Sequence, residues 1–394
     1  MTHAFHRTLA SDHAVYRGNF PTEEGLVSGT LTTSGDRILE YDLGGSESEP
    51  DLPSFVPGFY DFRAGGLEFL KAERTGIRPA AARSFQRFDA ILATTGVTHP
   101  LTTIMLENPE GGGHALQAAS DRVRLLESAQ KVGVPRVPHR VHLLCELTND
   151  GVAEQACELI AERHPAIALV SLMDHSPGPG QFKTYECWCG TIAARLGHHA
   201  ARIALLGCQR REASASRFQE RAGQVTDGAL AYGFPVAAHD LESPVQVHFA
   251  CEIGATICEF PMNVETTCVA AAGGQFVVAG ASNIVNGGSH VGNVSALDLM
   301  KAVPKLALTY DYAPGSLAQA WSLLNENNGA FAACQATAGH ASRVLAQNES
   351  GQFCLGARAD LVVVCKMGEF VLVQAVWQRG AKSRSAVHRL GRFF

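Results

Sequence analysis

Several short stretches of this sequence place imidazole and carboxylate side chains directly after an apolar run. Residues 166–175 read AIALVSLMDH, an aliphatic run that ends in Asp174 and His175. Imidazole and carboxylate groups bind borderline divalent metals such as Zn²⁺, and they also act as general acids and bases. One such stretch alone is most simply a core strand capped by a histidine. The pattern recurs, however, and the other runs end in Glu146, in His239 and Asp240, and in Asp311.

The apolar runs themselves are typical of parallel strands that are covered on both faces. Stretches of helical pattern lie between them, for example Ser120–Val132, Val152–Arg163 and Ser214–Tyr232. Eight candidate strands are present: Val56–Phe62, Val97–Leu106, Arg140–Leu147, Ala166–His175, Pro235–Asp240, Ala255–Phe260, Phe276–Ala281 and Leu306–Asp311.

Eight strands alternating with helices over residues 55–345 predict an α/β fold, a (β/α)₈ barrel whose functional groups gather where the strands end. An open doubly wound sheet is the alternative. No G-x-G-x-x-G follows a candidate strand, so a dinucleotide-binding sheet has no support. Residues 1–54 and 346–394 read instead as short antiparallel strands with turn signals, and a Gly/Ser/Glu/Pro-rich linker covers 44–53. We expect both ends of the chain to build one small β domain.

Composition narrows the class of protein. A formal net charge of −6 over 394 residues argues against a general nucleic-acid or membrane-surface binder. The N-terminus has no apolar core of signal-peptide type, and no apolar run approaches the roughly 18 residues of a membrane helix. The 11 cysteines show no framework spacing, and Cys187 and Cys189 are too closely spaced for a C-x-x-C pair. We therefore expect a cytoplasmic protein with reduced thiols.

Several motifs resemble one family. GASNIVNGGSHVGN (280–293) and VSLMDHSPG (170–178) are the most specific, and PHRVHLLCEL (138–147), AAHD (237–240), EFP (259–261) and LGARADLVVV (355–364) accompany them. Together they resemble the amidohydrolase superfamily and, within it, the diphosphatases of the carbon–phosphorus lyase pathway. The similarity extends from about residue 57 to residue 382, and it implies a barrel of amidohydrolase type.

The resemblance also implies a reaction and a set of residues. A divalent metal would activate water for attack on the phosphorus nearest the ribose of a ribosyl triphosphate, releasing diphosphate. Asp311 would be both a metal ligand and the general base. The matching metal ligands are Glu146, His175, His239 and Asp311. The matching substrate-binding residues are Asn283, Gly287, Gly288, Ser289 and His290, although a tight turn with a surface histidine is the simpler explanation of that loop.

The sequence departs from the family at its first barrel strand. The family has His-x-Asp shortly after a Pro-Gly pair, whereas here Pro57-Gly58 is followed by Arg63 and Gly65 at the two ligand positions. A guanidinium has no lone pair to offer a metal, and glycine has no side chain. We expect one divalent ion (Zn, Mn or Fe), with Arg63 as a catalytic group that clamps a phosphate. Asp61 lies one pleat deeper and is not expected to replace the lost ligands.

Other interpretations stay open. The residual site can serve a different substrate, or the chain can be a non-catalytic barrel that binds a phosphorylated ligand or a partner. Ordinary amide hydrolysis or base deamination is disfavoured because His-x-His is absent. We expect an anionic phosphorylated small molecule as ligand, no nucleic acid or membrane partner, and leave room for a homo-oligomer. A locally basic segment would steer the ligand, or would simply be a solvated face: Lys71, Arg74, Arg78, Arg83 and Arg87.

The strand count also differs from the family's usual arrangement. Superfamily ligands come from strands one, four, five, six and eight, whereas the count here puts the retained groups on strands three, four, five and eight. Either a strand is miscounted or the ligand set differs, and the flanking motifs favour the residue assignments over the count.

Overall fold

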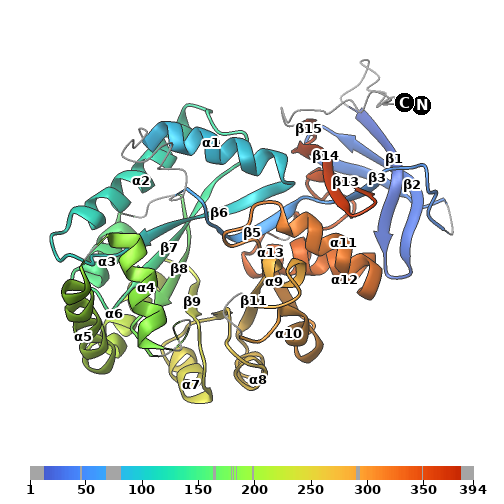
Figure 1. Cartoon of the computed structure of the whole chain (residues 1–394). Coiled ribbons are helices and arrows are strands. Elements are labelled where there is room, and N and C mark those ends of the chain that lie inside the picture. Colours follow the sequence, from blue (N-terminus) through green and yellow to red (C-terminus); the bar gives the residue numbers. More distant parts are fainter. Residues whose placement is uncertain are drawn as a thin grey trace.

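The computed structural model describes residues 13–44, 47–67, 81–162, 166–178, 180, 182, 184–197, 199–289, 293–347 and 349–382. Two sheets organise the chain, a barrel of eight parallel strands and a separate mostly antiparallel sheet (Figure 1). The barrel strands are β5 (Phe59–Ala64), β6 (Val97–Leu106), β7 (Arg140–Glu146), β8 (Ile167–Met173), β9 (Val236–His239), β10 (Ile257–Glu259), β11 (Phe276–Gly280) and β12 (Leu306–Thr309). The second sheet contains β1 (His13–Thr22), β2 (Gly25–Ser34), β3 (Arg37–Asp42), β4 (Ser54–Pro57), β13 (Leu361–Met367), β14 (Phe370–Gln378) and β15 (Ala381–Lys382).

The predicted barrel is confirmed, and each of the eight predicted strands corresponds to one barrel strand. β6 spans the ten residues that the sequence pattern indicated. The reason is burial on both faces, since all seven residues of β8 are buried. The strand count is confirmed as well, because the polar groups follow the third, fourth, fifth and eighth strands, β7, β8, β9 and β12.

The first predicted strand was wrong at its start. Residues 54–57 form β4, which pairs with β13 in the second sheet, and the chain enters the barrel only after Gly58. Gly58 is required at this crossing, because a Cβ there would lie 2.2 Å from Thr98 Oγ1. Its N–H donates to the Asp360 carbonyl oxygen at 2.9 Å, which ties the crossing to the second sheet.

Helices surround the barrel strands in Figure 1. The predicted helix starts were less accurate than the strands: α2 begins six residues before Ser120, and Ser214 belongs to the helix that precedes α6. The helices are α1 (Ala81–Thr94), α2 (His114–Lys131), α3 (Val152–Ala161), α4 (Tyr185–Leu196), α5 (Ala200–Ser216), α6 (Phe218–Ala231), α7 (Pro244–Glu252), α8 (Val264–Ala272), α9 (Ala281–Val285), α10 (Ala296–Ala302), α11 (Ser316–Asn328), α12 (Ala330–Cys334), a π-helical turn (Gln335–Gly339) and α13 (His340–Val344). Within the described residues, none of these helices is both long and apolar enough to cross a membrane.

The second sheet draws strands from both ends of the described chain, in the order β15-β14-β13-β4-β1-β2-β3. β1 and β2 form a ten-residue antiparallel ladder, and β13 and β14 are joined by a hairpin at Gly368, whose φ is 62°. Its core gathers aromatic rings, with Phe20 stacked on Phe55 at 5.3 Å. Short strands at both ends of the sequence thus meet in one sheet, as the pattern predicted.

The barrel closes through a buried carboxylate between β5 and β12. Asp61 Oδ1 accepts the N–H of Arg63 at 3.2 Å, the N–H of Tyr310 at 3.3 Å and the Thr309 hydroxyl. Within the described chain Asp61 Oδ2 makes no hydrogen bond. Burial raises the pKa of Asp61 to about 7, although the three hydrogen bonds oppose the shift. Asp61 is therefore a structural residue of the barrel seam.

The raised pKa of Asp61 should make the free energy of unfolding depend on pH, and a substitution of Asp61 can isolate this effect. A folded-state pKa above the unfolded value means that folded Asp61 holds its proton to higher pH, so its ionisation destabilises the fold as pH rises through 7. Asp61→Asn mimics the protonated group. Between pH 5 and pH 8 the wild type should lose about 2 kcal/mol of unfolding free energy relative to the variant. Urea unfolding of both proteins measures this; parallel pH curves would contradict it.

Candidate active site

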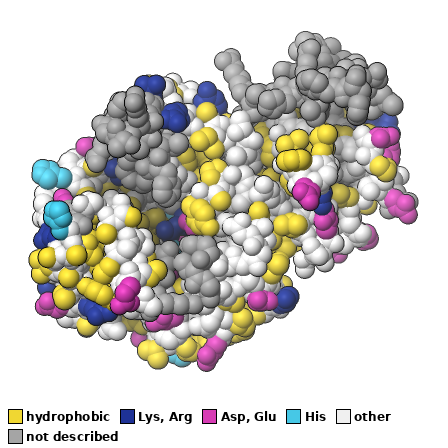
Figure 2. Space-filling view, in the orientation of Figure 1, with side chains coloured by type: hydrophobic (Ala, Val, Ile, Leu, Met, Phe, Trp, Pro, Cys, Tyr) yellow, Lys and Arg dark blue, Asp and Glu magenta, His cyan; other side chains and the backbone are white. Residues whose placement is uncertain are grey.

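A cavity of about 630 Å³ opens at the C-terminal end of the barrel strands. Figure 2 shows this face hollowed near its centre, with basic side-chain atoms visible in the hollow. The polar residues that line the cavity are Arg63, His175, Thr191, Arg210, His239, Asp240, Ser282, Asn283, Ser289, Asn293, Asp311 and Tyr312. Four of the predicted catalytic or metal-binding residues therefore face one space: Arg63, His175, His239 and Asp311.

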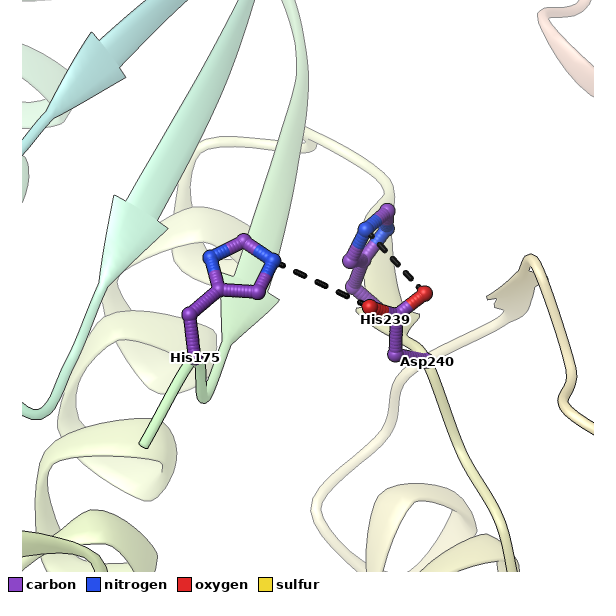
Figure 3. Close-up of side chains that lie close together, drawn as sticks. All are labelled: His175, His239 and Asp240. Carbon is purple, nitrogen blue, oxygen red and sulfur yellow. Dashed lines mark ion pairs between the residues drawn. The ribbon is translucent and has the colours of Figure 1, made fainter. Parts of the chain in front are cut away.

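Two imidazoles and one carboxylate converge at the mouth of the barrel (Figure 3). His175 Nε2 lies 3.8 Å from Asp240 Oδ2, and His239 Nε2 lies 3.3 Å from Asp240 Oδ1. One ligand atom from each of the three residues lies within 4.8 Å of the others. Within the described chain this is the one group of three or more His, Cys, Asp or Glu side chains close enough to hold a metal ion.

The turn after β8 fixes the position of His175. Asp174 Oδ1 accepts the Ser176 N–H at 2.9 Å and its Oδ2 accepts the Ser214 hydroxyl at 2.5 Å, so this carboxylate builds the turn. The indole N–H of Trp188 in α4 donates to the His175 carbonyl oxygen at 2.8 Å. α4 and its packing partner α5 thereby anchor the backbone at the histidine.

A buried carboxylate lies behind each imidazole. Glu146 Oε2 is 2.9 Å from His175 Nδ1, so Nδ1 carries the proton and donates it, which leaves Nε2 with its lone pair. On the other side Glu259 Oε2 lies 3.5 Å from His239 Nδ1. A carboxylate behind an imidazole fixes the ring's orientation and raises its basicity as a ligand.

Both carboxylates stay ionised despite burial. Burial opposes ionisation of Glu146, but the charge of Arg210 and the contacts with His175 and Thr148 outweigh it and lower its pKa to about 2. For Glu259, burial is outweighed by the charges of His142 and Arg63 and by the interaction with His239, and its pKa also falls to about 2. The two histidines are therefore backed by permanent negative charge near neutral pH.

His142, Ser171 and Glu259 form a buried hydrogen-bonded chain inside the barrel. His142 Nδ1 donates to the Phe62 carbonyl oxygen at 2.8 Å, and His142 Nε2 lies 2.6 Å from Ser171 Oγ. The Ser171 hydroxyl donates to Glu259 Oε2 at 2.6 Å, so it accepts from His142 Nε2–H. Burial lowers the pKa of His142 and the Glu259 carboxylate opposes that shift. The chain of hydrogen bonds therefore links the barrel strands β7, β8 and β10 behind the two imidazoles.

Arg63 extends into the cavity from the end of β5. Its Nε lies 3.1 Å from Asp311 Oδ1, and its Nη1 lies 3.3 Å from His239 Nδ1. The guanidinium carbon lies 5.7 Å from the centre of the Phe260 ring, a cation–π contact. The Arg63 side chain is 12% exposed, so part of it is accessible from the cavity. A cation thus occupies the region between the eighth-strand carboxylate and the fifth-strand histidine.

Gly65 is held against the backbone of the eighth strand. Its N–H donates to the Asp311 carbonyl oxygen at 3.0 Å, and a Cβ on Gly65 would lie 2.3 Å from that oxygen. No side chain fits there unless the backbone moves. The second ligand position of the first strand has therefore been replaced by a close backbone contact.

Three residues that follow barrel strands have left-handed backbone conformations. Asp240, Phe260 and Asp311 have φ angles of 55°, 53° and 59°. Such angles are uncommon for residues other than glycine and cost energy that the surrounding structure must offset. They turn the chain sharply at the ends of β9, β10 and β12. Two of the three residues line the cavity through carboxylates.

The remaining predicted residues are placed less uniformly. Asn283 and Ser289 line the cavity, whereas Gly287 and Gly288 belong to the adjoining turn, where Gly287 has a φ of 72°. His290, Lys71, Arg74 and Arg78 lie outside the described residues, and Arg83 and Arg87 are on the exposed face of α1. Cys187 and Cys189 are in α4 and belong to no metal-binding group among the described residues.

The sequence analysis left two important residues without a role. Asp240 was identified at a strand end but not selected as a ligand, and Glu259 appeared only inside the EFP motif. Glu259 ends β10, the sixth barrel strand, from which the superfamily also takes a ligand. That position was the signal that could have identified it. Glu146 meanwhile lies behind His175, so its predicted role as a ligand stays a prediction.

The donor set fits one divalent ion. Two imidazole Nε2 atoms and one carboxylate, with space left on the cavity side, match the three-ligand pattern of catalytic zinc sites. Arg63 pairs with Asp311 and Arg210 lies 3.9 Å from Glu146. Among the described residues, the ion pairs of Asp240 are those with the two imidazoles. A cation between these groups would supply the missing positive charge.

Comparisons with known proteins agree with this geometry. The chain is 28% identical over 372 residues to the alpha-D-ribose 1-methylphosphonate 5-triphosphate diphosphatase of Escherichia coli (strain K12), a match that covers 91% of this chain and 97% of that protein. A search of protein-family models finds no match.

Solved structures show the same architecture. An amidohydrolase superposes with a TM-score of 0.57 at 14% identity, covering 96% of this chain and 99% of the other. The 5-methylcytosine deaminase of Klebsiella pneumoniae, solved with phosphonocytosine, gives 0.56 at 11% identity and covers 96% and 100%. The chain therefore has the amidohydrolase-type fold, a (β/α)₈ barrel with a second sheet from both ends of the chain, and it resembles the ribose methylphosphonate triphosphate diphosphatase over most of its length.

Proposed function

We propose that the protein is a metal-dependent hydrolase that releases diphosphate from a ribosyl triphosphate of phosphonate catabolism. The observation that carries the proposal is the convergence of His175, His239 and Asp240 beside Arg63 at the barrel mouth. The similarity to a triphosphate diphosphatase over 91% of the chain supports the choice of substrate. α-D-ribose 1-methylphosphonate 5-triphosphate is therefore the first compound to assay.

The site divides into a metal-binding half and a phosphate-binding half. His175, His239 and Asp240 would hold the ion, which would activate water and neutralise charge on phosphoryl oxygens. Glu146 and Glu259 keep the two rings oriented, through contacts of 2.9 and 3.5 Å to the Nδ1 atoms. The ligand set is thus prepared before any ion arrives.

The phosphate-binding half is formed by Arg63, Asn283 and Ser289. The Arg63 guanidinium presents several N–H donors in a plane, which suits phosphoryl oxygens that gain charge during the reaction. Asp311, 3.1 Å from Arg63 Nε, is the carboxylate suited to take the proton of the attacking water. The ion pair with Arg63 keeps this carboxylate at the cavity wall.

Elemental analysis and a product assay test the proposal together. Protein purified without chelators should contain about one equivalent of zinc, manganese or iron, and should release diphosphate from α-D-ribose 1-methylphosphonate 5-triphosphate. Protein that contains no metal and takes none up would favour a non-catalytic barrel that binds a phosphorylated ligand. Two equivalents would mean that the space occupied by Arg63 and Gly65 still admits an ion.

Glu146 offers a test of its own role. If it orients His175 from behind, Glu146→Gln keeps a hydrogen-bond acceptor at Nδ1 and should preserve metal stoichiometry while weakening affinity about 10- to 100-fold. Competition with a chromophoric chelator measures that affinity. Complete loss of the ion at saturating metal would show instead that Glu146 is a direct ligand. Glu158→Gln, on the outer helix α3, is the matched control and should bind metal as the wild type does.

A further inference from the structure

A second cavity, of about 570 Å³, lies at the opposite end of the barrel. It lies where β5, β6 and β7 begin and where the loop before β13 and the turn after β14 approach them. Its residues come from both the barrel and the second sheet. They are Tyr60, His99, Pro100, Leu101, Pro138, Arg140, Leu345, Ala346, Gln347, Glu349, Ser350, Arg358 and Arg379.

Positive charge predominates in this second cavity. Arg140, Arg358 and Arg379 line it, and the charges of all three act on His99, whose pKa burial and these cations lower well below its usual range. Glu349, the one carboxylate in the lining, pairs with Arg37 at 2.6 Å. Asp360 lies behind the wall, buried. Three guanidinium groups therefore face one neighbouring carboxylate.

Arg358 presents an unused pair of donors. Its Nε and Nη2 atoms are buried, and within the described chain neither makes a hydrogen bond. Nε lies 3.3 Å from Asp360 Oδ2, but not in hydrogen-bond geometry. Nε and Nη2 form the edge of a guanidinium that binds a carboxylate or phosphate with two parallel hydrogen bonds. Buried donors left unpaired are costly, and Asp360 Oδ2 also makes no hydrogen bond, so the Arg358–Asp360 ion pair leaves hydrogen-bonding capacity unused on both sides.

His99, in β6, also has a buried polar atom without a hydrogen bond. Its ring stacks on Tyr60 at 4.1 Å, and its Nδ1 lies 2.9 Å from the Thr98 hydroxyl. His99 Nε2 is buried and makes no hydrogen bond among the described residues; it lies 3.5 Å from Asp360 Oδ2. Polar atoms without a hydrogen bond thus occur on both the barrel and the sheet side of the cavity.

The backbone holds the arginines in place. Arg379 has a φ of 50°, and its N–H donates to Asp360 Oδ1 at 2.9 Å. The N–H of Arg358 donates to the Glu349 carbonyl oxygen at 2.5 Å. Gln378 Nε2 reaches across to the Thr98 carbonyl oxygen at 2.7 Å, so the turn after β14 is fixed against β6. A ligand would meet a prepared set of charges.

The two cavities are separate sites. They share no lining residue. Buried apolar side chains fill the barrel between them, among them Phe62, Leu169 and Ile257. A small anion bound at one end would therefore not compete directly with a ligand at the other.

We propose that the second cavity binds a small anionic metabolite, whose phosphate or carboxylate group binds the guanidinium of Arg358. Arg140 and Arg379 complete the charge complement, and Pro100, Leu101 and Pro138 supply an apolar wall for the rest of the molecule. The simpler explanation is that Arg358 only neutralises Asp360. That explanation gives no role to the guanidinium groups of Arg140 and Arg379 or to the 570 Å³ cavity.

Calorimetric titration with inorganic phosphate and with malonate tests this site. Because the active site is also expected to bind phosphate, the titrations use the full chain and its Arg63→Met variant, both freed of metal with a chelator, so that neither a metal nor Arg63 holds phosphate at the active site of the variant. One binding event should persist in Arg63→Met. It should weaken about 10- to 100-fold in Arg358→Gln, which loses two charge-assisted hydrogen bonds. If phosphate binds more tightly than malonate, the ligand class is a phosphate ester. If malonate binds more tightly, the ligand class is a polycarboxylate.

A second variant and a control complete the experiment. Arg140→Gln removes a cavity charge. Arg140 donates a long hydrogen bond of 3.4 Å to the Ile167 carbonyl oxygen, so its replacement tests the site even if Arg358→Gln unfolds. Arg124→Gln, on exposed α2, should bind both anions as the wild type does. Diphosphate release should be unchanged in Arg140→Gln. Unaltered anion binding in both cavity variants, or binding that vanishes in Arg63→Met alone, would overturn the proposal.

Discussion

Replacing His239 with alanine should remove the bound metal and lower diphosphate release by about 10³-fold or more, since a catalytic metal supplies several kcal/mol of transition-state stabilisation. His239 is one of three groups that converge on one point, and Asp240 Oδ1 lies 3.3 Å from its Nε2. Two remaining ligands rarely retain a divalent ion in water. Metal content by elemental analysis and the rate of diphosphate release are the two readouts.

Two further variants make this result interpretable. Asp240→Asn keeps a side chain that tolerates the left-handed φ of 55° at this position, while it removes the negative charge. It should also bind metal weakly. His248→Ala changes an exposed histidine on α7 and should keep both metal and activity. If His239→Ala retains a full equivalent of metal, the ion is held elsewhere, and the convergence at the barrel mouth has another purpose.

The barrel could be predicted from the sequence because its strands are short, apolar and separated by helices. β6 and β8 are buried along nearly their whole length, so hydrophobicity alone marks them. The passage from β4 to β5 could not be predicted in the same way. Residues 55–60 form one apolar run, and the close approach of Thr98 to Gly58 marks where the chain passes between the two sheets. That contact joins residues forty positions apart, beyond the reach of local pattern.

The same distinction between local pattern and long-range contact applies to the candidate site. That Glu146, His175, His239 and Asp311 follow strands is a local property, and the sequence shows it. Which face of His175 meets Glu146, and which meets Asp240, depends on the ring's orientation. This orientation is set by Trp188, Thr148 and the turn at Asp174, which come from different segments. Sequence spacing therefore identified the residues that gather but not which carboxylate faces which nitrogen of each imidazole.

Gly65 shows most clearly what the three-dimensional structure adds. From the sequence, Arg63→His with Gly65→Asp is expected to restore two ligands and raise metal stoichiometry from one to two. In the structure a Cβ on Gly65 would lie 2.3 Å from the Asp311 carbonyl oxygen. The double variant should therefore be destabilised and should not gain a second ion. Thermal unfolding with metal analysis measures both effects.

Arg63→Met should retain the metal and reduce turnover by about 10²- to 10³-fold, the cost of removing one preorganised donor to a developing charge. Methionine keeps much of the side-chain volume beside Phe260, so the loss reflects the missing charge and hydrogen bonds. Arg63→Lys should recover little, because an ammonium cannot contact Asp311 and lie beside His239 Nδ1 at once, as the guanidinium does at 3.1 and 3.3 Å.

Arg124→Met on α2 is the control for loss of an arginine. The effect should appear mainly in kcat at saturating substrate, since the phosphoryl group gains charge in the transition state. A rise in KM with unchanged kcat would show that Arg63 only binds substrate, and metal loss would show that it supports the ligand set through His239.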